Sequence, residues 1–133
     1  MKKTILVSLV VTGSIICFAF RPDSKKPWKA AVQAAAKANP VKSSTESISD
    51  GKTLYVKHCQ SCHGKSGLGD GTKAAQLKTE PGDFSKSQFQ SQSDGTIFYK
   101  ISEGRDDMPS FKKKMPEASD IWNVVNYIRT LKK

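Results

Sequence analysis

Five consecutive residues have the clearest potential for chemistry: Cys59-Gln60-Ser61-Cys62-His63. Two cysteines separated by two residues and followed at once by histidine suit covalent haem attachment, because two thioether bonds can fix a porphyrin while a ring nitrogen of His63 reaches its iron. The same residue types also occur in zinc sites, in redox-active dithiols and in ordinary disulfides or free thiol pairs. The rest of the chain has to decide among these uses.

The other residues favour haem over the alternatives. A structural zinc site needs four ligands, but the only other histidine and cysteine are His58 and Cys17, and the candidates near the motif would crowd onto one turn. A thioredoxin-like dithiol is typical of a strand that enters a helix in a βαβ unit, and no such pattern is found. We interpret His58 as a surface or packing residue and not as a ligand.

A second place for chemistry lies between Gly104 and Phe111. With no spare histidine, a six-coordinate iron needs a sulfur ligand, and only Met108 and Met115 follow the N-terminal leader. Both precede a proline. Met115 stands just before the expected last helix, whereas Met108 lies in a longer loop that can cross an open face of the cofactor. We therefore prefer Met108, while simple core filling is the alternative for each methionine.

Two helices would have to hold this site. Ser49 or Asp50 can cap the first, which runs through Gly51 and Tyr55 into the motif. Ser119 can cap the last, whose apolar residues recur at helical spacing. The apolar face of the last helix consists of Ile121, Val124, Val125, Ile128 and Leu131, and the residues expected to point elsewhere are Asn123, Asn126, Arg129 and Lys132.

The stretch between these helices predicts loops and one short helix. Residues 64–72 are rich in glycine, but they lack the features of a phosphate loop. The glycines are expected to let the backbone pass close to the edge of the haem and turn with positive φ. Phe84 and Phe89 are candidates for a pocket wall or for ordinary core packing. Residues 94–101 read as a helix capped by Ser93 or Asp94 and ended by Gly104.

The N-terminal third is organised differently. Residues 1–20 have the form of a signal peptide or membrane anchor; cleavage after Ala19, retention of residues 5–20 as an anchor, and lipidation of Cys17 all remain open. Residues 21–47 are expected to form a tether that contains an alanine-rich helix over residues 28–38. Trp28 and this helix either serve as a spacer or pack back on the domain formed by residues 48–133, where they would cover part of the haem or of the core.

Composition limits the other classes of function. The net charge is +10, of which residues 1–47 contribute +6 and residues 48–133 contribute +4. Only three arginines occur and no basic stripe with interleaved aromatics is present, which argues against nucleic acid binding. The apolar side chains of about 80 residues give a marginal core, so a haem would supply the missing apolar centre.

Taken together, the cysteine motif, the Met108 loop and the two flanking helices resemble those of class I, single-haem c-type cytochromes over residues 48–133. The resemblance implies an all-α fold of three to five helices around one covalently bound haem c. It implies that Cys59 and Cys62 hold the haem, that His63 is the proximal iron ligand, and that Met108 is the second one. Gly51 and Tyr55 are then expected to meet the last helix near Val124 and Tyr127.

The function implied by the resemblance is one-electron transport rather than enzymatic catalysis. The expected place is the periplasm, in a respiratory chain, between redox protein partners such as membrane oxidase or dehydrogenase complexes, with possible membrane attachment through residues 5–20. Lys112, Lys113 and Lys114 either steer an acidic partner or form an ordinary solvated run. The alternatives are a haem subunit of a larger oxidoreductase complex and an open-site haem protein such as a peroxidase or gas sensor.

Overall fold

The computed structural model of the chain describes residues 28–133, which are almost entirely helix and loop. Its elements are α1 (Val32–Ala35), α2 (Thr45–His58), α3 (Gln60–His63), the 3-10 helix η1 (Ala74–Gln76), α4 (Ser87–Gln90), α5 (Asp94–Glu103) and α6 (Ala118–Arg129). Within residues 28–133 there is no strand, and one isolated bridge joins Arg105 to Met108. The predicted all-α class is confirmed.

The predictions for the leader fall outside the described residues. They concern the signal peptide or anchor over residues 1–20 and the beginning of the tether. No helix between residues 28 and 133 combines the length and the apolar character needed to cross a membrane.

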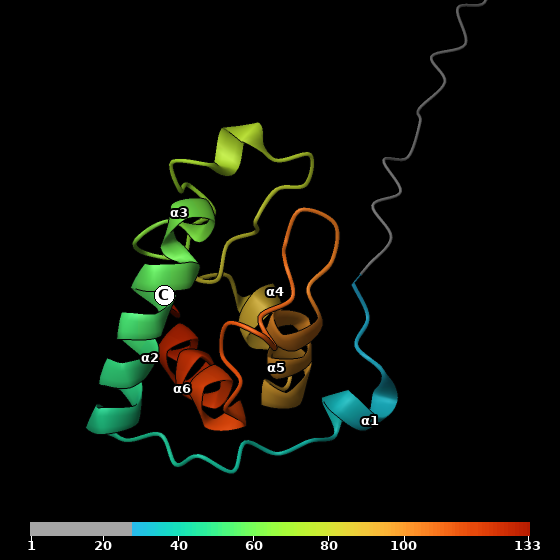
Figure 1. The fold of residues 1–133 in the computed structure, drawn as a ribbon, viewed down its shortest axis with the longest axis vertical. Coiled ribbons are helices and arrows are strands. Elements are labelled where there is room, and N and C mark those ends of the chain that lie inside the picture. Colours follow the sequence, from blue (N-terminus) through green and yellow to red (C-terminus); the bar gives the residue numbers. More distant parts are fainter. Residues whose placement is uncertain (1–27) are drawn as a thin grey trace, which may run out of the picture.

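The centre of the fold is the crossing of α2 and α6, which lie against each other in Figure 1. Gly51 allows the close approach: a Cβ built on it would lie 2.0 Å from the backbone oxygen of Asn123 and 3.0 Å from Cβ of Tyr127. One helical turn later the rings of Tyr55 and Tyr127 are 5.1 Å apart. The expected meeting of Gly51 and Tyr55 with the last helix is therefore confirmed.

Around this crossing the apolar face of α6 forms the core. Val124 and Val125 are fully buried, and Trp122 is 1% exposed and stacks on Phe98 of α5 at a ring distance of 4.2 Å. Leu131 lies beyond the end of α6, yet it still packs against the core. Burial of this face supplies the main stabilising contribution to the helix pair.

The helix starts differ from the predicted ones. The cap expected at Ser49 or Asp50 is wrong, because α2 already begins at Thr45, where Ser44 Oγ accepts a hydrogen bond from the Ser47 amide at 3.2 Å. Ser47 in turn donates to Asn123 Oδ1 at 2.7 Å, so contact with α6 stabilises the extra turn. The cap expected at Ser119 is also wrong, because α6 begins at Ala118 without a side-chain cap.

The prediction for α5 is confirmed at both ends. Ser93 Oγ accepts a hydrogen bond from the Thr96 amide at 3.2 Å, and Gly104 follows the last residue with a φ of +68°. Arg129 at the end of α6 donates to Asp94 Oδ1 at 2.8 Å. The two helices are thus joined where α5 begins and α6 ends.

Residues 28–41, here called the docked segment, pack back on the domain. The helix predicted over residues 28–38 is too long, because only Val32–Ala35 is helical. The Ala35 carbonyl accepts from Ser93 Oγ at 2.7 Å instead of continuing a helical ladder, and a Cβ on Gly95 would lie 2.1 Å from the Ala34 carbonyl oxygen. Figure 1 shows α1 beside α5.

A buried amide fixes the end of the docked segment. Asn126, expected to point away from the core, is only 4% exposed, so that prediction is wrong. Its Nδ2 donates to the Val41 carbonyl at 3.2 Å and to Ser47 Oγ at 2.8 Å, while its Oδ1 accepts from Asn39 Nδ2 at 2.8 Å. The polar side chain is buried because the docked segment supplies its partners.

Candidate functional site

The cysteine motif lies at the junction of two helices. α2 ends at His58, and Cys59 precedes the single turn of α3 that contains Cys62 and His63. Both thiols are free and half-buried. Burial, with a smaller contribution from Cys62, raises the pKa of Cys59 to about 12, so the unmodified side chain is a neutral thiol at neutral pH.

The loop after the motif folds back onto α3. Three of its amides donate to motif carbonyls: Gly69 to His63 at 2.9 Å, Gly71 to Cys62 at 3.2 Å, and Lys73 to Ser61 at 2.8 Å. A Cβ on Gly71 would lie 2.4 Å from the Ser61 carbonyl oxygen. The predicted positive φ is found at Gly64, Gly67 and Gly69. The close approach of Gly71 is made to the backbone of the motif, whereas the expected approach to the edge of the haem stays a prediction.

The side chain of His63 is held mainly by packing. Its ring stacks on Phe84 at 4.5 Å, Phe89 packs behind Phe84 at the same distance, and Nδ1 is buried without a hydrogen bond. Burial lowers the pKa of His63 to about 4, although the Pro81 carbonyl acts to a smaller extent in the opposite direction. The imidazole is therefore neutral, the form that can bind a metal.

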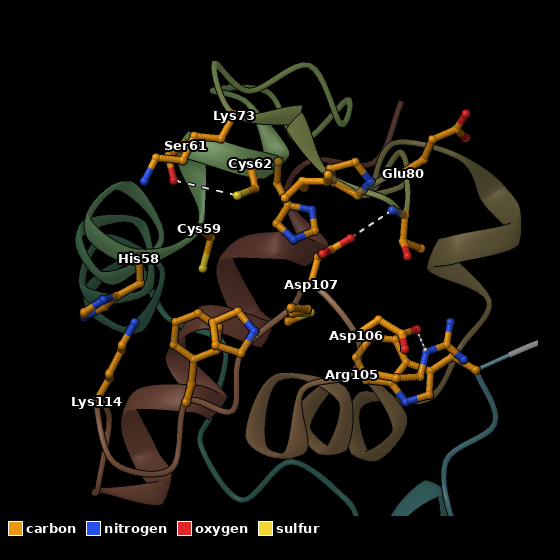
Figure 2. A pocket seen from close by; sticks show the side chains of 18 residues that line it. His58, Cys59, Ser61, Cys62, Lys73, Glu80, Arg105, Asp106, Asp107 and Lys114 are labelled. Carbon is orange, nitrogen blue, oxygen red and sulfur yellow. Dashed lines mark hydrogen bonds and ion pairs between the residues drawn. The ribbon is translucent and has the colours of Figure 1, made fainter. Parts of the chain in front are cut away.

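The motif opens onto a cavity of about 290 Å³, shown in Figure 2. One wall comes from the motif, one from residues 73–81, one from residues 105–114, and Trp28 of the docked segment completes the lining. The lining residues are Trp28, His58, Cys59, Ser61, Cys62, His63, Lys73, Leu77, Thr79, Glu80, Pro81, Arg105, Asp106, Asp107, Met108, Pro109, Phe111 and Lys114. All four predicted site residues, Cys59, Cys62, His63 and Met108, are therefore brought to one hollow.

The two candidate methionines have different places. Met108 is half-buried and lines the cavity, and its backbone pairs with that of Arg105 in both directions, at 2.8 and 2.9 Å. Met115 is 1% exposed and belongs to the hydrophobic core. Of the two, Met108 alone faces the cavity, and core filling accounts for Met115.

Other predicted residues take secondary positions. Phe84 and Phe89 do not line the cavity but support His63 from behind. His58 lies at the rim, where its ring packs against Phe111 at 6.0 Å, and Figure 2 shows it close to Lys114. Both observations agree with a packing role for His58.

One contact of the cavity had no signal in the sequence. The Thr79 amide donates to Asp107 Oδ2 at 3.0 Å, which links two walls that are 28 residues apart in the chain. This contact follows no helical or alternating pattern. The place of Trp28 in the lining agrees with the expectation that it packs back on the domain, and not with that of a spacer.

The lining suits a large, flat, mostly apolar cofactor. Two thiols, a buried neutral imidazole and a thioether share one hollow with apolar side chains such as Leu77 and Pro81. Between residues 28 and 133, no three His, Cys, Asp or Glu side chains converge as they would around a bare metal ion. The donor set therefore fits covalently attached haem better than zinc.

The comparisons with known proteins agree with this geometry. Residues 46–128 match the family model described as cytochrome c oxidase, cbb3-type, subunit III. No curated protein matches the chain.

Among solved structures, a chain of the Kuenenia stuttgartiensis reducing HAO-like protein complex Kustc0457/Kustc0458 is similar, with 27% identity and a TM-score of 0.65. That match covers 71% of this chain but only 47% of the other. The KustC0563 c-type cytochrome is 31% identical with a TM-score of 0.56, over 63% of this chain and 99% of the other. Cytochrome cL from Methylophaga aminisulfidivorans MPT, 20% identical with a TM-score of 0.50, covers 64% and 55% of the two chains and shows the same fold.

Proposed function

Because the chain belongs to the cytochrome c family described as subunit III of the cbb3-type cytochrome c oxidase, and so carries covalently bound haem c, we propose that it is a one-electron carrier between redox proteins. Cys59 and Cys62 would hold the haem through thioether bonds, and His63 and Met108 would be the two axial ligands. When bound, haem c supplies an iron that alternates between Fe(II) and Fe(III). The observation that carries the proposal is that His63 and Met108 line the same cavity.

The chain's own residues favour a site that changes little during electron transfer. His63 is fixed by its stacking on Phe84, and Gly64, which follows it, accepts a hydrogen bond from the buried Tyr55 hydroxyl at 2.7 Å. Met108 is fixed by its two backbone hydrogen bonds to Arg105. Ligands held on both sides would favour a closed coordination shell around the iron, which suits electron transfer better than binding of a substrate.

Electron exchange would take place on the side of the two cysteines. Both are half-buried, so the edge of a cofactor attached to them would lie near the surface. Lys73 and Lys114 line the same cavity and are exposed, whereas Lys112 pairs with Glu103 at 2.6 Å. Positive side chains beside the attachment wall favour an acidic redox partner.

Export to the periplasm and work in a respiratory chain, with membrane oxidase or dehydrogenase complexes as partners, are part of the same proposal. The form of residues 1–20 supports export, since it combines a positive start with an apolar run. Mass spectrometry of the mature protein tests this directly. A mass equal to that of the chain without residues 1–19, plus one haem, would support export with cleavage after Ala19.

The sixth ligand is tested by replacing Met108. Met108→Ala should remove the sulfur-to-iron charge-transfer band from the oxidised spectrum and lower the reduction potential, because a soft neutral thioether favours Fe(II). Met115→Ala is the matched control, which should keep the band and lose about 2–5 kcal/mol of stability as a large-to-small core change. A high-spin, five-coordinate spectrum in the unmodified protein would refute the carrier function and favour an open-site haem protein.

A second candidate function is that of a fixed haem subunit in a larger oxidoreductase. The observation in its favour is the similarity to a chain that belongs to a protein complex, together with a family description as an oxidase subunit. Gentle solubilisation followed by size-exclusion chromatography separates the two candidates. Elution as a stable complex with a second redox protein would favour the subunit, and elution as a free haem protein would favour the carrier.

A further inference from the structure

Trp28 lies before the residues that the family model matches, yet its side chain lines the cavity. Its ring centre is 4.8 Å from Cζ of Arg105 and 5.5 Å from Nζ of Lys100. A cation placed this close to an indole is attracted by the ring's electron density, and tryptophan is the best aromatic partner for this contact. Trp28 therefore holds Arg105 at the rim of the cavity.

Arg105 is coupled to Met108 by the backbone. The amide of each residue donates to the carbonyl of the other, at 2.8 and 2.9 Å, which closes a tight turn over residues 105–108. Asp106 in this turn has a φ of +52°, an unfavourable value for a residue with a side chain, and its carboxylate is 3.2 Å from Nε of Arg105. A shift of Arg105 would therefore move Met108 with it.

The turn is held from a second side. Asp107 accepts the hydrogen bond from the Thr79 amide described above, and Figure 2 marks this contact beside Glu80. In the same view Cys59 and Cys62 lie on one side of the cavity, and Arg105 and Asp106 lie on the other. The loop that contains Met108 is thus braced by the wall of residues 73–81 and by Trp28.

Trp28 can serve as a brace because the docked segment is anchored independently of the cavity. The Ser93 hydroxyl binds the Ala35 carbonyl, and Nζ of Lys37 lies 4.9 Å from the ring of Phe98. Further along, Asn39 binds the buried amide of Asn126. These contacts join the segment to α5 and α6, which form the rigid core.

We propose that Trp28 is a positioning residue, which acts through Arg105 to keep the turn of residues 105–108 closed and Met108 at the sixth coordination position. This inference rests on the proposed function of Met108 as a ligand. It assigns part of the site to a segment outside the matched family domain. Loss of the Trp28 ring should let the turn open more often without unfolding the protein.

The test uses the full haem-loaded chain and added imidazole, which competes with Met108 for the iron. Trp28→Ala should keep the charge-transfer band but raise the affinity for imidazole about tenfold, equivalent to about 1.4 kcal/mol. Hydrogen exchange of the Met108 amide should accelerate by a similar factor. Trp28→Phe should restore most of the original affinity, and Val32→Ala, at an 81% exposed position on the same segment, should change nothing.

A double-mutant cycle tests the route through Arg105. In an Arg105→Gln background, Trp28→Ala should have little further effect on imidazole affinity. Unchanged imidazole affinity and Met108 exchange in Trp28→Ala would overturn the inference, and so would an undiminished effect in the Arg105→Gln background. If Met108→Ala keeps the charge-transfer band, Met108 is not the iron ligand and the proposed function is refuted at that point. This result differs from the two outcomes that would overturn only the role of Trp28.

Discussion

Replacement of Gly51 by alanine tests the helix crossing on which the whole site depends. The added methyl group would lie 2.0 Å from the backbone oxygen of Asn123 and 2.5 Å from its carbonyl carbon. These are backbone atoms of a helix and cannot rotate away, so α2 and α6 would have to separate by about 1.5 Å to restore normal contact. Such a separation would also break the 2.7 Å hydrogen bond between Ser47 and Asn123.

The size of the effect follows from three contributions. Overpacking costs about 1–3 kcal/mol, the lost hydrogen bond adds about 0.5–1.5 kcal/mol, and the better helix propensity of alanine returns up to about 1 kcal/mol. With the full propensity gain subtracted, these contributions sum to a loss of about 0.5–3.5 kcal/mol in the free energy of unfolding. We expect Gly51→Ala to lie toward the upper end, because the clash is with backbone atoms. The close contact between Tyr55 and Tyr127, one turn away, should be weakened as well.

Urea unfolding of the haem-loaded protein, followed by circular dichroism, measures this loss. The midpoint should fall while the slope with denaturant stays the same, because the surface exposed on unfolding is unchanged. Lys52→Ala is the matched control, since Lys52 is the next residue of α2 and is exposed; its effect should stay within about 0.5 kcal/mol. If Gly51→Ala were as stable as the unmodified protein, the argument from close helix approach would be refuted.

Two further changes test the contacts that support the site. Tyr55→Phe removes the hydroxyl that donates to the Gly64 carbonyl. The free energy of unfolding in urea should fall by about 1–3 kcal/mol, because a buried acceptor is left unsatisfied. An unchanged free energy of unfolding would contradict this role of the hydrogen bond. Asn126→Ala removes the hydrogen-bond partner that Asn39, Val41 and Ser47 share. Limited proteolysis should therefore cut before residue 42 much faster in this variant than in the control Asn123→Ala. Equal rates of cleavage would refute the anchoring role of Asn126.

The sequence allowed the fold class and the centre of the site to be predicted, because both depend on local patterns. The apolar spacing from Ile121 to Ile128 predicts the buried face of α6, and Ser93 and Gly104 mark the ends of α5. The motif from Cys59 to His63 needs only three residue types at fixed spacing. Because the chain has no second usable histidine, the sequence predicts a methionine as the other iron ligand. Met108, the methionine predicted for this role, lines the cavity.

The errors came from contacts between distant parts of the chain. Asn126 reads as a solvent-facing residue on an amphipathic helix, since nothing in its own helix shows that Asn39 and Val41 will cover it. The alanines after Trp28 predict a longer helix on propensity alone, but the Ala35 carbonyl is taken by Ser93. Propensity is a weak influence that tertiary hydrogen bonds readily override.

Docking of residues 28–41 also changes how far the domain could travel from a membrane. If residues 5–20 stay in the membrane as an anchor, only the seven residues 21–27 separate them from Trp28. A linker of that length spans at most about 25 Å when fully extended. The whole stretch 21–47, left undocked, could extend about 95 Å. With such an anchor, a linker shortened about fourfold would keep the haem cavity close to the lipid. It would raise the effective concentration of the cavity toward neighbouring membrane proteins and leave distant partners out of reach.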